Sequence, residues 1–495
     1  MPQLFFSSSD QEAKRLSALC RKGQLRRIRQ GVYTDGPPES DGSLINSRWH
    51  EVVAYLYPDA IAAYRTAYEL KPVDGFVVIV ARVKKPAVIK IGWYLRISVQ
   101  PGDPSIGHQQ FLPELSRSNV PRFLLENLTP SRNTAAFVKS FGAGWVEEYL
   151  AKELQKRGET ELNSIRDQAR ELSYSLGLES QFTQLDKIIG ALLSSRPVDS
   201  LTNQLAIATA KHEPYDTVRL QRFEELAEYL SRFSFPHCDY QFSRSSWRNL
   251  SFFESYFSNF IEGTEFLIEE AEEIVFKKQT VNQRHQDSHD VLALYELTYD
   301  YQEMITTPQT PDELLSLLQM RHQLMMAERP DKRPGQFKEK NNQAGDTLFV
   351  EPQLLEGTLT QAFEYYLALP KGLSRAIYMQ FMISECHPFD DGNGRLSRLM
   401  MNAELTEANS YKIIVPTVHR DSYLNGLRQA TREGKFRTLC KVFYQLQCYA
   451  ASVNWQNYGE ALEKIEDDYC LKLPDDGVAV FNRKISAFKI ELPVR

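Results

Sequence analysis

The segment from His387 to Arg398 (HPFDDGNGRLSR) constrains the fold of this 495-residue chain more than any other. Gly392 and Gly394 flank Asn393, so the backbone can adopt positive φ there and bring its N–H groups close to a ligand. Apolar residues then recur at helical spacing, at Leu396, Leu399, Met400 and Ala403. Because the N-terminus of a helix attracts anions, the segment predicts an anion-binding turn that opens a buried helix.

The side chains around this turn are those that phosphate chemistry uses. His387 supplies a titratable base. Asp391 offers a hard oxygen ligand of the kind that Mg²⁺ prefers, next to the turn. Arg395 and Arg398 are three residues apart and therefore share a helix face. Any one of these features alone could be an ordinary helix cap, a buried histidine or a surface arginine, but together they are typical of a nucleotide phosphate site.

The segment resembles the Fic family signature, His-x-Phe-x-Asp/Glu-Gly-Asn-Gly-Arg-x-x-Arg, and every fixed position is filled. The resemblance implies an all-α core that transfers AMP from ATP to a Ser, Thr or Tyr hydroxyl of a protein target, or of the chain itself. It also implies that His387 deprotonates the hydroxyl, Asp391 binds Mg²⁺ and Phe389 anchors the loop. The implied phosphate ligands are Gly392, Asn393, Gly394, Arg395 and Arg398.

Two flanking segments extend the resemblance. Residues 329–352 interrupt the helical pattern with two glycine turns and then alternate, which predicts a β-hairpin. The family has a flap here that pairs with the target segment, and the corresponding residues are Phe337, Lys338, Leu348 and Phe349. Many relatives have Arg where this chain has Lys338, so the sequence leaves the target open. Tyr423, in an Arg-x-x-Tyr-x-x-x-Leu pattern, is expected either to line an adenine pocket or to pack in the core.

Upstream, the segment Ser258-Asn-Phe-Ile-Glu262-Gly263 places Ser258 and Glu262 on one helix face, and Gly263 is expected to end that helix. A carboxylate in the last turn is disfavoured by the helix dipole by about 0.3–1 kcal/mol, so Glu262 is expected either to have a cationic partner elsewhere or to be a solvated surface glutamate. The segment resembles the Fic inhibitory motif Ser-x-x-x-Glu-Gly. That resemblance implies that Glu262 pairs with Arg398 and holds ATP in a non-productive pose, and it leaves open whether the protein also removes AMP from its targets.

Residues 1–60 form the most basic part of the chain. Ser9 and Glu12 have the spacing of a capping box, which predicts a helix from Ser9 to Gln24, and alternation from Leu25 to Tyr33 predicts a short hairpin. The basic residues are Lys14, Arg15, Arg21, Lys22, Arg26, Arg27 and Arg29. One interpretation is a solvated basic face. The segment also resembles the winged-helix module of AbiEi-type antitoxins, which implies contacts with duplex DNA through its phosphates.

The remaining segments complete a multidomain, mainly α organisation. Residues 61–195 alternate between strands, expected at 75–83 and 87–99, and helices, expected at 135–157 and 159–176, which predicts an α+β middle domain without a catalytic cluster. Residues 215–450 read as the Fic domain, with its inhibitory helix at 250–263. Residues 451–495 predict a helix followed by two strands, at 478–481 and 485–492.

Composition sets further limits. The net charge of −6 disfavours a protein that coats nucleic acid, although it permits a local basic module. The six cysteines include no C-x-x-C pair, so we expect neither a zinc site nor a disulfide framework. No leader or membrane-spanning pattern is apparent, so we expect a cytoplasmic protein. The sequence does not define the oligomeric state, and a homo-oligomer is compatible with it.

Three functional hypotheses remain at this point: an autoinhibited AMP transferase, a Fic-type enzyme that transfers a whole phosphate or UMP, and a DNA-binding regulator with a vestigial Fic domain. The intact base, acid and turn disfavour the third. The Gly-Asn-Gly-Arg motif is unaltered here, which disfavours transfer of the γ-phosphate because Fic enzymes of that type typically depart from this motif. A kinase fold is excluded as well, because His419-Arg420-Asp421 lacks the required Asn at position 426, which is Gly.

Overall fold

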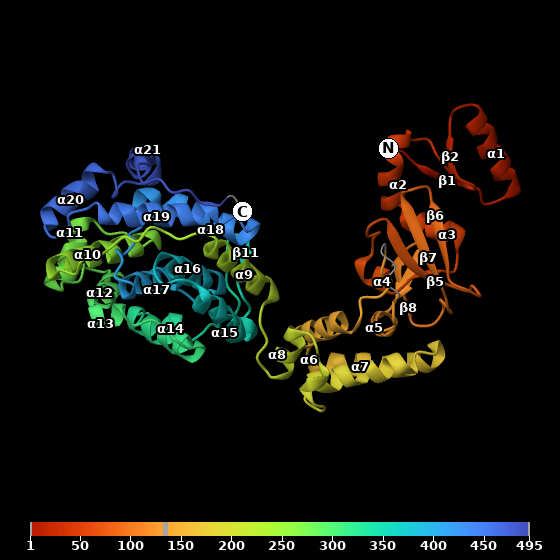
Figure 1. Ribbon diagram of the computed structural model, residues 1–495, viewed down its shortest axis with the longest axis horizontal. Helices are drawn as coiled ribbons and strands as arrows, with labels where there is room; N and C mark the ends of the chain where they lie inside the picture. Colours follow the sequence, from red (N-terminus) through yellow and green to blue (C-terminus); the bar gives the residue numbers. More distant parts are fainter. Residues whose placement is uncertain (1, 132–136, 494–495) are drawn as a thin grey trace. The chain divides into compact units, whose positions relative to one another are not determined.

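The computed structural model describes residues 2–131 and 137–493, and the chain divides into two compact units, Met1–His212 and Glu213–Arg495. Each unit has its own hydrophobic core. Among the described residues, none of the helices combines the length and the apolar character that crossing a membrane requires. Figure 1 shows the elements of both units.

The first unit begins with a small three-stranded antiparallel sheet in the order β1-β3-β2. Its elements are β1 (Leu4–Phe6), α1 (Asp10–Arg21), β2 (Arg26–Arg29) and β3 (Val32–Thr34). Ser9 Oγ accepts a hydrogen bond from the Glu12 amide at 3.2 Å, so the predicted N-cap is present. Gly31 has φ +83° between β2 and β3, where a Cβ would collide with the Tyr55 hydroxyl, and this explains the predicted hairpin glycine.

A six-stranded mixed sheet follows, in the order β6-β7-β5-β4-β9-β8. Its strands are β4 (Ile61–Ala62), β5 (Phe76–Ala81), β6 (Ala87–Ile91), β7 (Leu95–Pro101), β8 (His108–Leu112) and β9 (Leu115–Ser118). Every residue of β5 is buried, and β5 runs parallel to β7. The single strand predicted over 87–99 is wrong: Gly92, with φ +54°, turns the chain back so that β6 and β7 pair antiparallel.

The basic N-terminal segment and this sheet share one core. Helices η1 (Pro38–Ser40), α2 (Asp41–Ser47) and α3 (Trp49–Leu56) connect them. Val32, Trp49 and Val52 belong to the same buried cluster as Val77 and Ile97 of the sheet. Residues 2–60 therefore depend on the sheet for the burial of their apolar side chains.

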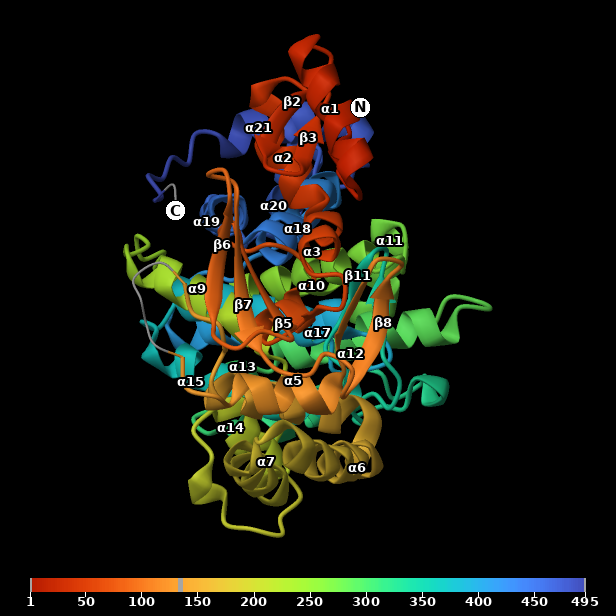
Figure 2. The same cartoon turned by 90° about the vertical axis from the view of Figure 1, so that its right-hand side faces the viewer.

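Helices complete the first unit: α4 (Arg65–Glu69), α5 (Val120–Asn127), α6 (Ala143–Leu176), α7 (Glu179–Leu192), η2 (Val198–Ser200) and α8 (Gln204–Ala210). Helices α6 and α7 lie side by side (Figures 1 and 2). Gly158 has φ +76° inside α6 and marks the break that was predicted between two helices. The start of the first predicted helix, at residues 135 and 136, lies outside the described residues, and α6 begins only at Ala143.

The second unit is helical apart from one hairpin, β10 (Gln343–Ala344) and β11 (Thr347–Leu348), among its described residues. Its first helices are α9 (Thr217–Ser231), α10 (Arg244–Ile261), α11 (Ile268–Lys277), α12 (His285–Tyr299), α13 (Tyr301–Met304), α14 (Pro311–Met325) and η3 (Pro330–Lys332). The others are α15 (Pro352–Ala368), α16 (Leu373–Cys386), α17 (Asn393–Glu407), η4 (Thr417–His419), α18 (Arg420–Glu433), α19 (Arg437–Ala451), α20 (Tyr458–Asp467) and α21 (Pro474–Ile485). Helix α17 is buried at almost every position, so the helix after the predicted turn lies at the centre of this core.

The prediction of two C-terminal strands is wrong. Residues Pro474–Ile485 form α21, which has Pro474 at its start, acidic residues in its first turn and basic residues in its last. Phe481 and Ile485 are both buried, four residues apart, which is a helical spacing. The short run Val478 to Phe481 looked like a strand because four consecutive apolar residues do not distinguish the two periods.

Candidate functional site

The signature turn connects two packed helices, α16 and α17. Helix α16 ends at Cys386, and His387 then adopts a left-handed conformation with φ +49°. Gly392, with φ +73°, precedes the first residue of α17. The first turn of α17 therefore begins directly after the glycine, with no side-chain cap, as the sequence predicts for an anion-binding turn.

Buried contacts hold the turn in place. The Asn393 side chain accepts a hydrogen bond from the Phe389 amide at 2.9 Å and donates to the Phe389 carbonyl at 2.8 Å. Phe389 is fully buried, as expected of an anchor, and stacks on the ring of His322 with centroids 3.8 Å apart. The Asn393 side chain is therefore used inside the loop, which leaves only its backbone for a ligand.

His322 is a supporting residue that sequence reasoning missed. Its Nδ1 accepts a hydrogen bond from the Gly335 amide at 2.9 Å, so Nε2 carries the proton and donates to the Asp391 carbonyl at 3.1 Å. Burial lowers the pKa of His322 to about 4, which keeps the ring neutral. Its spacing from Leu318 and Met325, four and three residues, was the available signal, because it places His322 on the buried face of α14.

Lys338 lies under the loop and not on the outer face of the flap. It is 3% exposed, and its Nζ donates to the Cys386 carbonyl at 3.1 Å and to Asn342 Oδ1 at 2.8 Å. Asn342 in turn donates to the Phe389 carbonyl at 2.9 Å. The charge of Lys338 is therefore directed at backbone carbonyls of the loop, and its assignment to the target-binding part of the flap stays a prediction.

The other three flap residues have different environments. Leu348 is 61% exposed and is available to a partner. Phe349 stacks on the His387 ring with centroids 3.8 Å apart and planes 5° from parallel. Phe337 is half-buried and packs against Phe389. The hairpin therefore meets the candidate base directly, through Phe349.

His387 has the environment of a neutral base. The pKa of His387 is lowered to about 4, mainly by burial. The charge of Lys338 acts in the same direction, while a hydrogen bond to the Ser384 carbonyl and the charges of Glu262 and Asp391 act in the opposite one. Nδ1 lies 3.3 Å from the Ser384 carbonyl oxygen. A proton on Nδ1 would make this bond and leave the Nε2 lone pair free, which is the tautomer that general-base catalysis needs.

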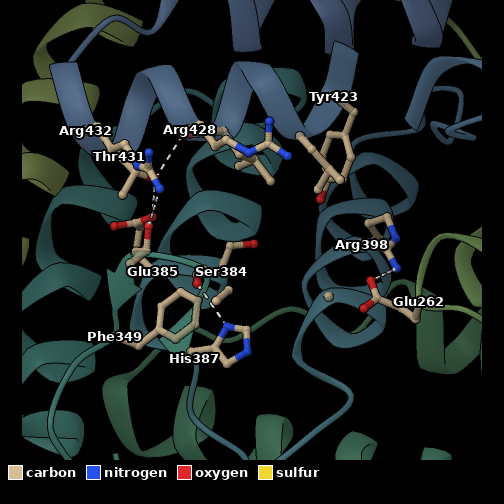
Figure 3. Close-up of a pocket in the computed structure, with 16 residues that line it drawn as sticks. Glu262, Phe349, Ser384, Glu385, His387, Arg398, Tyr423, Arg428, Thr431 and Arg432 are labelled. Carbon is tan, nitrogen blue, oxygen red and sulfur yellow. Dashed lines mark hydrogen bonds and ion pairs between the residues drawn. The ribbon is translucent and has the colours of Figure 1, made fainter. Parts of the chain in front are cut away.

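A cavity of about 410 Å³ opens next to His387, between the signature turn, the flap and α18. Figure 3 shows His387 on one side of it, with Arg428 and Thr431 of α18 opposite and with Arg398 next to Tyr423. Its volume is within the range of small-molecule sites, about 300–1,000 Å³. Its described lining residues include three of the predicted ATP-binding residues, namely Gly394, Arg398 and Tyr423.

Glu262 occupies the end of the cavity next to α17. Its Oε1 accepts a hydrogen bond from Arg398 Nη2 at 2.7 Å, so the predicted pairing is present. Arg398 also donates through Nε to Ser258 Oγ at 2.9 Å. A Cβ at Gly394 would collide with Glu262 Oε1, which shows how closely this carboxylate approaches the first turn of α17. Gly263, with φ +90°, follows the last residues of α10 as expected.

Arg395 points away from the cavity and into the core. Its Nη1 donates to Asp290 Oδ2 at 2.6 Å, and Asp290 also accepts from Arg329 at 2.8 Å. Arg395 and Asp290 are 3% and 0% exposed. The structure does not bring Arg395, Gly392 or the Asn393 side chain to the described cavity lining. Arg395 is instead neutralised by the buried carboxylate of Asp290, which no local sequence pattern predicts.

Asp391 and Tyr423 complete the predicted set. The Asp391 side chain is 44% exposed, and Oδ1 accepts a hydrogen bond from the Gly392 amide at 2.6 Å. Within residues 2–131 and 137–493 there is no group of three or more His, Cys, Asp or Glu side chains that could hold a metal. Tyr423 is both cavity lining and core, because it is 1% exposed and its hydroxyl accepts from Gln380 at 2.8 Å.

The fold and the site together define an all-α domain in which a glycine turn opens a buried helix, with a neutral histidine beside it. Comparison with known families gives the same result: residues 312–405 match the Fic/DOC family, and the chain therefore contains a Fic/DOC domain.

Several curated relatives are named "Protein adenylyltransferase Fic". The one from Drosophila persimilis is 25% identical over 243 residues, which cover 48% of this chain and 47% of that protein. The one from Nematostella vectensis is 26% identical over 270 residues, covering 52% of this chain and 61% of that protein. The chain thus spans about half the length of the Drosophila relative.

Solved structures with a Fic domain are also similar to this chain. A Fic domain containing signaling protein from Bacteroides thetaiotaomicron is 16% identical with a TM-score of 0.37, covering 47% of this chain and 94% of that one. Fic-1 from C. elegans is 15% identical with a TM-score of 0.35, covering 65% of this chain and 98% of that one.

Proposed function

We propose that the Fic domain transfers AMP from ATP to a Ser, Thr or Tyr hydroxyl of a protein, which can be the chain itself. The observation that carries this proposal is a neutral His387 beside a cavity that ends at the N-terminus of α17. The name of the curated relatives, adenylyltransferase, supports the choice of AMP as the transferred group.

In the proposed reaction the target hydroxyl oxygen attacks the α-phosphorus of ATP. The bond to the α-phosphorus forms as the α–β phosphoanhydride bond breaks, pyrophosphate leaves, and the hydroxyl proton moves to Nε2 of His387. The amides of the first turn of α17 and the Arg398 guanidinium would hold the phosphates, because both present N–H donors to anions. Most of the catalytic effect then comes from positioning and charge stabilisation.

Asp391 fits the role of a magnesium ligand. Mg²⁺ is usually bound through one or two carboxylates, with phosphate oxygens and water completing the coordination. A single, partly exposed carboxylate beside the phosphate turn meets that requirement. When bound, the ion would neutralise phosphate charge. Asp391 itself is oriented by its bond with the Gly392 amide.

Autoinhibition by Glu262 is the second part of the proposal. Glu262 takes up the two features that would otherwise bind phosphate, the Arg398 guanidinium and the start of α17. Its carboxylate would also repel the γ-phosphate. ATP would therefore bind with its phosphates displaced, and a displacement of even about 1 Å slows such reactions strongly. The same carboxylate could orient water and remove AMP from a modified target.

One labelling experiment tests the type of reaction. Purified protein is incubated with Mg²⁺ and ATP that carries label on either the α- or the γ-phosphate, in wild type and in the Glu262→Gly variant. Protein-bound α-label supports AMP transfer. Protein-bound γ-label would overturn it in favour of phosphate transfer. In a parallel incubation with UTP labelled on the α-phosphate, protein-bound label would favour UMP transfer.

We further propose that the N-terminal segment contacts duplex DNA. Lys14, Arg15, Arg21 and Lys22 lie at exposed or half-exposed positions of α1 and just after it. Solvent-accessible cations on one helix suit the phosphate contacts that dominate non-specific binding to DNA. The winged-helix resemblance implies that one helix is offered to the major groove, and we propose α1 for this role because of its exposed cations.

A further inference from the structure

A second cavity lies against α18, and it shares none of its described lining residues with the candidate active site. Its volume is about 600 Å³. It lies between α18, the start of α19 and the C-terminal part of α21 with the segment that follows. The polar lining residues are His419, Ser422, Asn425, Thr438, Gln445, Asn482 and Ser486.

The charge of this cavity is positive. Arg437 and Lys441, four residues apart on α19, line it, and none of its described lining residues is acidic. Helix α19 begins at Arg437 without a side-chain cap, so the amides of its first turn add a partial positive charge at the same place. Two cations and a free helix N-terminus favour an anion.

His419 gives independent evidence for a ligand. It is 3% exposed, and neither of its ring nitrogens has a hydrogen-bond partner among the described residues. Burial lowers its pKa to about 4, so the ring is neutral, with one unsatisfied donor and one unsatisfied acceptor. Buried groups of this kind are normally hydrogen-bonded, because an unpaired donor or acceptor destabilises the fold. Each nitrogen points in a different direction, so hydroxyl groups of a ligand that enters from the cavity would supply the partners.

The C-terminal segment covers one side of the cavity and is fixed there. Gln445 donates from Nε2 to the Ile485 carbonyl at 3.0 Å, and the Tyr229 hydroxyl donates to the Pro493 carbonyl at 2.9 Å. Ile490 and Leu492 provide an apolar wall. The cavity therefore offers a cationic end, a hydroxyl and amide lining, and one apolar side.

We propose that this cavity binds a phosphate monoester of a sugar or nucleoside. The phosphate would lie against Arg437, Lys441 and the first turn of α19, and the hydroxyl groups would face His419 and the serine and asparagine side chains. This proposal does not depend on the proposed AMP transfer, because the two cavities have no described lining residue in common.

The test follows the ring of His419 in the full-length protein labelled with ¹³C-histidine, titrated with ribose 5-phosphate and with inorganic phosphate. The His419 resonance is assigned by its loss in His419→Asn. We expect the His419 resonance to shift saturably with both probes. Ribose 5-phosphate should bind more tightly than inorganic phosphate, because only its sugar hydroxyls can reach His419 and the serine and asparagine side chains. Binding should weaken at least tenfold in Arg437→Gln/Lys441→Gln.

Two control variants make the result specific. Lys435→Gln removes one positive charge just before α19, where Lys435 pairs with Glu433 and does not line the cavity, so binding should be unchanged. Arg398→Ala alters the other cavity and should leave the His419 titration unchanged. Resonances of the other histidines report whether each variant is folded. The absence of a saturable shift, or equal affinity in wild type and the double variant, would overturn the proposal.

Discussion

The signature turn of the second unit and helix α1 of the first unit place their charged residues in opposite environments. Around the signature turn in the second unit, Arg395, Arg398 and Lys338 are all buried, and each is paired with a carboxylate or with carbonyl groups. In the first unit, the basic residues of α1 reach solvent, and the ion pair between Arg15 and Glu12 on this helix spans 3.6 Å. Buried pairs fix geometry, whereas exposed cations are mobile and screened by salt.

This difference indicates where each kind of function can reside. A reaction needs groups held to a fraction of an ångström, which buried pairing supplies. Attraction to a polyanion needs only surface charge. Changes in the second unit should therefore alter rates with little dependence on salt, and changes in α1 should alter salt-dependent binding without affecting the reaction.

The largest effect should come from His387→Ala. Loss of the general base should slow α-label incorporation by about 10²–10⁴-fold, while ATP affinity stays close to that of wild type because no phosphate contact is removed. Both quantities are measured in the Glu262→Gly background, with ATP binding followed by calorimetry. His237→Ala, which removes an exposed histidine of the same unit, is the control and should keep full activity. Near-normal turnover without His387 would show that another group takes the proton.

Acid should destabilise the second unit more than the first. His322, His387 and His419 all lie in the second unit, and burial lowers each pKa from 6.5 to about 4. The unfolded chain binds these protons first as the pH falls, so the contribution of the histidines to stability is full above pH 6.5 and is lost toward pH 4, by at most about 3 kcal/mol per histidine. Burial raises the pKa of Glu404 to about 7, which contributes in the opposite direction and offsets part of this loss. The free energy of unfolding of each unit is measured by urea unfolding at pH 7.5 and at pH 5, with hydrogen exchange used to monitor the two units separately. Equal losses in both units would contradict it.

The same lowered pKa predicts the pH dependence of the reaction. Because His387 stays neutral above about pH 4, the initial rate of AMP transfer should change by less than about twofold between pH 6 and pH 8. A histidine with an ordinary pKa near 6.5 would instead lose most of its base form at pH 6. Initial rates across this range, with the protein first shown to be folded at each pH, decide between them.

Glu262→Gly should raise AMP transfer by an order of magnitude or more, because it frees Arg398 and the start of α17 for the phosphates. The measurement is incorporation of α-label by wild type and variant at matched concentrations. Glu265→Gly is the matched control, since Glu265 is an exposed glutamate three residues further on. Equal labelling by wild type and Glu262→Gly would refute autoinhibition, and labelling by Glu262→Gly/His387→Ala would refute the role of His387.

Local patterns in the sequence predicted several parts of the site. The turn, the helix after it, the buried Phe389 and the end of α10 at Gly263 follow from spacing and glycine positions. The Glu262–Arg398 pair was predicted through a family resemblance, because 136 residues separate the two partners.

Partners brought together by tertiary packing were not predictable. Asp290 is 105 residues from Arg395 and lies on an otherwise ordinary helix. No local pattern therefore indicated that Arg395 is paired in the core and does not bind phosphate. The contacts of Lys338 with the loop were not predictable either, because nothing local shows that the loop carbonyls lie above it. In the first unit, the shared core of residues 2–60 and the sheet was missed, because burial across two segments has no sequence period.

The smallest expected effect is on the affinity for duplex DNA, and measuring it tests the function proposed for the first unit. Because residues 2–60 share a core with the sheet, the experiment uses the full chain. We expect weak binding of duplex DNA whose affinity falls steeply with salt. Each lysine that neutralises a phosphate should contribute about 0.9 to the slope of log K against log salt. Lys14→Gln/Lys22→Gln should therefore lower the slope by about 2 and leave AMP transfer unchanged.

The control for this prediction is Lys84→Gln/Lys85→Gln, which removes the same charge from an exposed loop between β5 and β6 of the same unit. Fluorescence anisotropy of a labelled duplex between about 50 and 200 mM salt gives the slopes. If α1 lies against the DNA, the control keeps the wild-type slope, because its lysines are not at the interface. If both double variants lower the slope equally, the attraction is a property of net charge alone. If wild type shows no binding even at about 50 mM salt, the basic residues of α1 are a solvated surface, and the contrast between the two units then concerns stability and not ligands.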